Sequence, residues 1–102
     1  MSLVFVSTKK VRQHIRKRKV FPEDLMYSIQ KFFIEKNEAS KIKYVRFTIS
    51  NVIEEDKRVR RSLEVEVCSD TQISNEKLNK LNEMLAREFP SLNASVRIHC
   101  EE

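Results

Sequence analysis

The stretch Thr8–Ile15 (TKKVRQHI) recurs further along the chain as Asp56–Leu63 (DKRVRRSL), with similar residue types at corresponding positions. A helical pattern and a strand pattern follow each copy. Self-similarity of this kind is typical of duplicated structural units. The sequence therefore predicts an α+β fold of two tandem similar β-β-α-β motifs that share one sheet, with two helices on one face. We expect a single domain over residues 1–102, with copy one at about 3–50 and copy two at about 51–102.

The second copy contains the clearer strand pattern. Apolar and polar residues alternate along Val59–Cys68, which is typical of a half-buried strand. Residues 10–19 taken alone fit a strand, a basic helix or a disordered arm, but correspondence with the second copy favours a strand. Because Lys17 and Lys19 fall on its inward side, we expect an exposed edge strand there, protected by inward lysines.

The remaining elements follow from periodicity and capping signals. Pro22, with acidic residues after it, begins a predicted helix that ends near Asn37, and Ser74 caps a second helix that Pro90 terminates. Further strands are predicted at 3–6, 43–53 and 96–101, with a hairpin turn at 54–58. The chain contains no glycine, which excludes a P-loop or a Rossmann phosphate loop and leaves turns to residues such as Asn37, Asn51 and Asn93.

The charges are distributed unevenly along the chain. Residues 1–51 contain twelve basic and four acidic side chains, whereas residues 52–102 contain eight and eleven. The candidate binding surface consists of the basic residues in the two copies of the repeated stretch: Lys9, Lys10, Arg12, Arg16, Lys17, Arg18, Lys19, Lys57, Arg58, Arg60 and Arg61. Such a surface either contacts a phosphate backbone or is a solvated strand edge, and two equivalent basic turns could face one ligand.

No pattern in the sequence indicates catalysis. His14 and His99 lack partners at the spacing of a catalytic or metal site, so we expect exposed histidines, no catalytic or metal-binding residues, no cofactor and no enzyme activity. Cys68 and Cys100 form no CxxC pair. Strand alternation places them on opposite faces, which disfavours a disulfide between them.

The absence of glycine, the abundance of Lys, Arg, Glu and Ile, and the repeated motif within 102 residues give the chain a family resemblance. In these respects it resembles the small orphan proteins of viruses of hyperthermophilic archaea. The resemblance implies an α+β fold and a viral protein made in the cytoplasm of an archaeal host. It assigns no catalytic residue.

Two functions from different classes are compatible with these patterns. The first is a non-enzymatic protein-protein interaction module that binds a peptide or partner segment in the groove between the two motifs or at an exposed strand edge. The alternative is a nucleic-acid-binding protein that uses the basic N-terminal half. No apolar run approaches the roughly 20 residues that span a bilayer, so we expect no membrane contact. We expect an intracellular protein that is a monomer or a homodimer.

Overall fold

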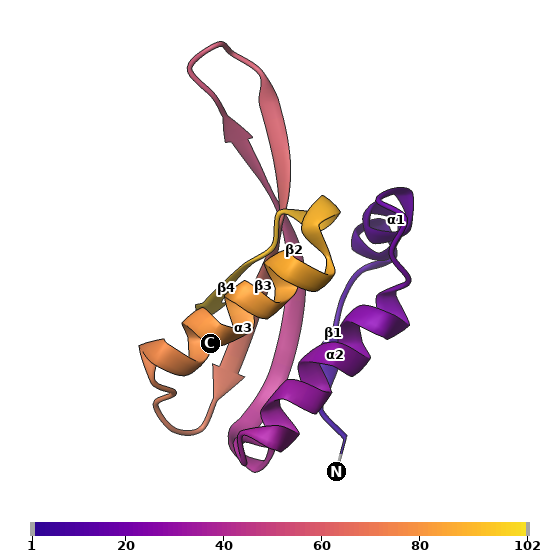
Figure 1. Cartoon of the computed structure of the whole chain (residues 1–102). Coiled ribbons are helices and arrows are strands. Elements are labelled where there is room, and N and C mark those ends of the chain that lie inside the picture. The colour runs from indigo at the N-terminus through magenta and orange to yellow at the C-terminus, as the bar shows by residue number, and fades with distance from the viewer. Residues whose placement is uncertain (1, 102) are drawn as a thin grey trace.

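A computed structural model, which describes residues 2–101, shows a four-stranded sheet with helices on one face (Figure 1). The α+β class is confirmed. The elements in chain order are β1 (Phe5–Val6), α1 (Lys9–Lys17), α2 (Pro22–Glu35), the 3-10 turn η1 (Ala39–Lys41), β2 (Ile42–Ile53), β3 (Val59–Ser69), α3 (Asn75–Glu88), the 3-10 turn η2 (Pro90–Leu92) and β4 (Ser95–Ile98).

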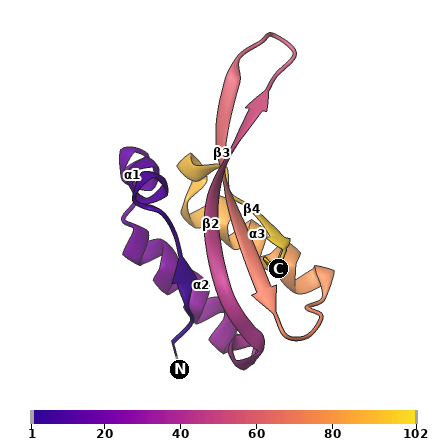
Figure 2. The ribbon, with the colours of Figure 1, turned by 180° about the vertical axis from the view of Figure 1, so that it is seen from behind.

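The sheet has the order β1-β2-β3-β4. β2 and β3 form a long antiparallel hairpin whose register runs from Ile42 opposite Ser69 to Ile53 opposite Val59. β1 pairs in parallel with β2, and β4 pairs in parallel with β3. Both outer strands are short, so the half of the hairpin nearest its turn has no neighbouring strand and projects from the body (Figures 1 and 2).

The core lies between the sheet and the helices. α2 contributes a buried stripe at intervals of about one helical turn, and α3 does the same from the neighbouring position. The buried side chains that form this layer include Leu25, Ile29, Phe33, Leu81 and Leu85 from the helices and Val45, Phe47, Leu63, Val65 and Val67 from the strands. The start of α2 at Pro22 and the cap of α3 at Ser74, whose Oγ accepts a hydrogen bond from the Lys77 amide, confirm the predicted helices.

The structure corrects the prediction of a strand at residues 10–19, because residues 9–17 form α1. Thr8 caps the helix by accepting a hydrogen bond from the Val11 amide at 3.2 Å. Val11, His14 and Ile15 lie three and four residues apart, so a helix buries all three on one side. A strand would bury only every second residue and would turn Lys17 and Lys19 inward, which explains why the helix is preferred.

The structure does not confirm the tandem repeat. Val11 lies in a helix and its counterpart Val59 lies in a strand, so the observed order is β-α-α-β-β-α-β. Figures 1 and 2 also show α2 and α3 on the same face of the sheet. One β-α-β unit leads from β1 to β2 and the other from β3 to β4, and the strands of the two units point in opposite directions. Both units progress in the same direction across the sheet, with their helices on the same face. One crossover is therefore right-handed, and the other is of the rare left-handed type. Units of opposite hand cannot be superposed.

A disulfide joins Cys68 to Cys100, which corrects the prediction that the two cysteines face apart. The strand alternation used for that prediction ends with β4 at Ile98. Beyond it, the chain reaches the helix-free face of the sheet, where the Tyr44 hydroxyl accepts a hydrogen bond from the Glu101 amide at 2.7 Å. Cys68 points to this same face, because its neighbour Val67 points into the core.

Candidate functional site

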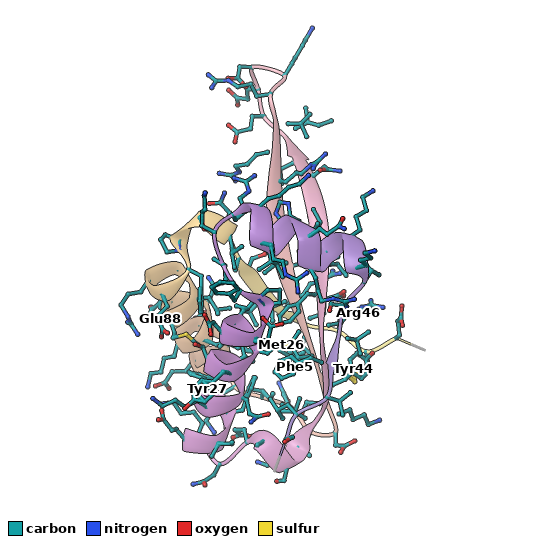
Figure 3. All side chains as sticks on the ribbon, turned by 90° about the vertical axis from the view of Figure 1, so that its right-hand side faces the viewer. Phe5, Met26, Tyr27, Tyr44, Arg46 and Glu88 are labelled. Atoms are coloured by element: carbon teal, nitrogen blue, oxygen red, sulfur yellow. A yellow bond between two sulfur atoms is a disulfide. The ribbon has the colours of Figure 1, made fainter. Side chains whose placement is uncertain are left out.

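The basic residues singled out from the sequence lie on adjoining elements at one end of the molecule. Figure 3 shows α1 lying across the base of the projecting hairpin. We call the exposed part of this hairpin, residues 51–61, the arm. Lys9, Lys10, Arg12, Arg16 and Lys17 are on α1, Arg18 and Lys19 directly follow it, Lys57 and Arg58 are at the turn of the arm, and Arg60 and Arg61 are on β3.

Two surface hollows join α1 to the arm. The first, with a volume of about 270 Å³, is lined by Lys10 and Val11 of α1, Ile49 and Asn51 of β2, and Arg61 of β3. In the second, of about 590 Å³, Arg18 lies with the basic arm residues Arg58, Arg60 and Arg61 and with the acidic arm residues Glu54 and Asp56. Positive charges that are far apart in the sequence therefore form one continuous surface, which we call the basic surface.

The exposed side of α1 is positive along its whole length. The helix contains no acidic residue, and its apolar stripe faces the body, so Lys9, Arg12, Arg16 and Lys17 are directed away from the core. Nine residues at 1.5 Å per residue give the helix a length of about 14 Å. Several phosphates fit along such a length, because duplex DNA has one phosphate per about 1.7 Å of its axis.

Some of these charges are already paired within the chain. Arg12 donates hydrogen bonds to the backbone oxygen and the hydroxyl of Ser7 at 2.7 and 3.1 Å, and Arg16 lies 3.9 Å from Glu23. Arg58 pairs with Asp56, and Arg60 pairs with Glu54 at 3.4 Å. The candidates without an ion pair in residues 2–101 are Lys9, Lys10, Arg12, Lys17, Arg18, Lys19, Lys57 and Arg61. Apart from Arg12, which Ser7 already engages, these cations remain available for an external anion.

His14 lies beneath the basic surface and is not exposed as the sequence suggested. Its side chain is largely buried on the inner side of α1, and its Nε2 atom has no hydrogen-bond partner in the described part of the chain. Burial lowers the pKa of His14, and the nearby charges of Arg18, Arg61 and Lys17 lower it further. The hollow that Lys10, Val11 and Arg61 line shows directly that α1 and β3 lie close together here.

The turn of the arm has a specific geometry. The Lys57 amide donates to the Glu54 oxygen, and the Glu54 amide donates to the Arg58 oxygen, both at 2.9 Å. Lys57 has a φ of 65°, in the left-handed region. A turn followed by one left-handed residue is a common way to close a hairpin. The predicted turn at 54–58 is thereby confirmed. Asn37 and Asn93 also adopt left-handed conformations, whereas Asn51 lies within β2 and the turn expected there is wrong.

Sequence reasoning missed the apolar pair on the arm. Ile53 and Val59 are cross-strand partners with 75% and 62% of their surfaces exposed. Their alternation with polar neighbours predicted burial, but the helices do not extend to this part of the hairpin (Figure 1). The lengths of the elements gave the available signal: β2 and β3 have 12 and 11 residues, and the 14-residue helices α2, which ends just before β2 begins, and α3, which starts just after β3 ends, are too short to cover them.

A separate groove lies between α2 and α3, away from the basic surface. It has a volume of about 490 Å³, and its lining is a mixture of acidic, basic and aromatic side chains that includes Tyr27, Phe32, Glu35, Arg87 and Glu88. Ser28 of α2 contacts Glu88 of α3 across it at 3.4 Å. This groove is where the peptide-binding hypothesis expects its ligand.

Among residues 2–101, no group of three or more His, Cys, Asp or Glu side chains could hold a metal ion. None of the described helices is long and apolar enough to cross a membrane. Comparisons of the chain with protein-family models, with curated proteins and with solved structures find no match. The likeness to archaeal virus proteins therefore stays a prediction, and the site has to be interpreted from its own geometry.

Proposed function

We propose that the protein binds nucleic acid through the basic surface formed by α1 and the arm. The observation that carries this proposal is the convergence of Lys10 and Arg18 with Arg61, which comes from a distant part of the chain. The two carboxylates beside Arg18 and Arg61, those of Glu54 and Asp56, are already paired with Arg60 and Arg58. Like charges repel, so gathering further unpaired cations here disfavours the folded state unless an anion is bound. A phosphate backbone supplies such an anion along the length of α1.

The structural alternative for these residues loses its main support. A solvated edge strand explains these residues only if residues 10–19 form a strand, because inward lysines protect such edges. α1 is a helix and has no strand edge to protect. Its charges therefore need a different explanation, and binding of a polyanion is the one that the geometry favours.

Binding of fluorescent 20-nucleotide DNA, single-stranded and duplex, tests the proposal when it is followed by anisotropy at several salt concentrations. We expect the logarithm of the affinity to fall linearly with the logarithm of salt, because binding to phosphates releases counterions. Replacing Lys10, Lys17 and Arg18 with glutamine should weaken binding and reduce the salt slope by about 0.9 for each phosphate that is no longer neutralised.

A matched variant controls for net charge. Lys31, Lys36 and Arg87 line the groove between α2 and α3, on other elements than the basic surface, and their replacement with glutamine removes the same charge. This variant should retain nearly all of the affinity. Equally weakened binding in both variants would mean that binding reflects net charge alone, and absence of binding at low salt would contradict the proposal.

A second candidate function is peptide binding in the groove between α2 and α3. Tyr27, with 64% of its surface exposed, and Phe32, which lines the same groove, offer aromatic contacts there among charged residues of both signs. This function does not require the two halves of the chain to be copies of one motif. Peptides selected from a random display library should lose binding to a Tyr27→Ala variant; selected peptides that are all insensitive to this change would exclude the groove as their site.

A further inference from the structure

The arm contributes little to the folded core. Every residue from Asn51 to Arg61 is exposed, and the pairs Asn51–Arg61, Val52–Arg60 and Ile53–Val59 form a free two-stranded ribbon. Its strands lie about 4.8 Å apart, as in any sheet. With its side chains, such a ribbon matches the major groove of B-form DNA, which is about 12 Å wide and admits a two-stranded ribbon or a helix.

The net charge of the arm differs between its tip and its base. The tip has three consecutive acidic residues, Glu54, Glu55 and Asp56, followed by the two basic residues Lys57 and Arg58, whereas Arg60, Arg61 and the adjacent α1 make the base positive. The major groove of a duplex offers matching groups in the same order, from its floor to its rims. Its phosphates line the rims of the groove, and its floor presents base edges that include the amino donors of adenine and cytosine. An arm that enters tip first therefore places Arg60 and Arg61 beside phosphates and the carboxylates of the tip beside amino groups.

Individual side chains support this orientation. Asp56 and Glu54 are paired with Arg58 and Arg60, so their repulsion of phosphates is reduced. Glu55 has no ion pair within residues 2–101 and can accept a hydrogen bond from a base edge. The exposed pair Ile53 and Val59 offers an apolar contact, for which the thymine methyl group is the counterpart in the major groove.

The same features argue against other nucleic acids. The major groove of A-form RNA is deep and too narrow for side chains to be read there. Single strands are usually held by stacking on aromatic side chains, and residues 51–61 include none. We infer that the arm enters the major groove of B-form duplex DNA while α1 contacts the phosphates beside it. This inference rests on the proposed nucleic-acid binding and specifies its substrate.

A shortened arm tests the inference. Replacing the seven residues Ile53–Val59 with Asn-Gly, a favoured two-residue hairpin turn, joins Val52 to Arg60 and keeps Arg60, Arg61 and α1. The segment removed contains three acidic and two basic residues, so the variant is more positive than the native chain. Electrostatics alone therefore predicts equal or tighter binding, whereas insertion of the arm into the groove predicts that its removal weakens binding.

Anisotropy would be measured with three 20-nucleotide probes: duplex DNA, duplex RNA and single-stranded DNA. We expect the native protein to prefer duplex DNA by about tenfold or more, since only the B-form duplex has a major groove wide enough to admit the arm. The shortened variant should lose this preference and bind all three probes through phosphate contacts. Equal affinity of the native protein for all three probes, or an unchanged preference in the variant, would overturn the inference and leave the proposed function standing. Absence of binding to every probe would remove the proposed function itself.

Chemical footprinting identifies the groove. Dimethyl sulfate methylates guanine N7 in the major groove and adenine N3 in the minor groove, so the two positions report separately on the same complex. The native protein should protect guanine N7, and the shortened variant should not. Protection confined to adenine N3 would place the arm in the minor groove and contradict the inference.

Discussion

Glu38, in the turn after α2, and Lys77, in the first turn of α3, form an ion pair that joins the two halves of the chain. The Glu38 carboxylate is buried, with 5% of the residue exposed, and Lys41 lies 3.3 Å from its second oxygen. The hydrogen bond from Lys77 is the main cause that lowers the pKa of Glu38. A buried carboxylate is tolerated only while its cations are in place.

Replacement of Lys77 with methionine should destabilise the protein by about 1–3 kcal/mol, because the change leaves a buried charged acceptor without its main donor. Stability measured by urea unfolding at pH 7 checks this value. The control is Lys80→Met, which removes an exposed i,i+4 pair with Glu76 on the same helix and should cost about 0.5 kcal/mol or less. Equal destabilisation of the two variants would show that the burial of Glu38 carries no special cost.

The histidine beneath the basic surface should make stability dependent on pH. The pKa of His14 is lowered in the folded state, so between that pKa and about 6.5 the unfolded chain binds more protons. Stability should therefore fall as the pH decreases below about 6.5. A His14→Gln variant lacks this titration, and its stability should change less over the same range. Parallel stability curves for the two proteins between pH 7 and pH 5 would contradict the effect.

The disulfide should contribute substantially to stability. Cys68 and Cys100 are separated by 32 positions, and closing a loop of that length restricts the unfolded chain by about 3–4 kcal/mol in the chain-entropy model. Urea unfolding with and without dithiothreitol measures the effect. The reductant should lower the unfolding midpoint of the native protein and leave a Cys100→Ala variant unchanged. A native midpoint that is insensitive to complete reduction would mean that the bond adds nothing.

Local signals were sufficient to predict much of the fold. Pro22 and Ser74 fixed the starts of α2 and α3, and the alternation along β2 and β3 fixed the hairpin. The sequence analysis missed α1 because it relied on correspondence with the second copy. The structure shows the local signals for the helix, which are the cap at Thr8 and the stripe that His14 completes with Val11 and Ile15. The disulfide was missed because strand alternation was extended past Ile98, where β4 ends.

The candidate site shows the same limit. The sequence identified the basic residues of both clusters and raised the idea that they face one ligand. It could not show that one cluster is a helix and the other a ribbon, because the hollow that joins Lys10 to Arg61 brings together residues half the chain apart. The exposure of Ile53 and Val59 also depends on where the helices end relative to the hairpin, which local patterns do not specify.

The conformation of Lys57 leads to a prediction about the arm itself. A non-glycine residue in the left-handed region costs about 1–2 kcal/mol, because its Cβ crowds the following carbonyl, and glycine avoids this cost. Lys57→Gly should therefore stabilise the turn by up to about 1 kcal/mol, once the greater freedom of glycine in the unfolded chain is counted. Hydrogen exchange of the Glu54 amide, which bonds to the Arg58 oxygen across the turn, reports directly on opening of the arm. We expect about fivefold slower exchange in Lys57→Gly and no slowing in Lys57→Ala, which removes the same charge but keeps Cβ. Equal slowing in both variants would assign the effect to charge and not to backbone conformation.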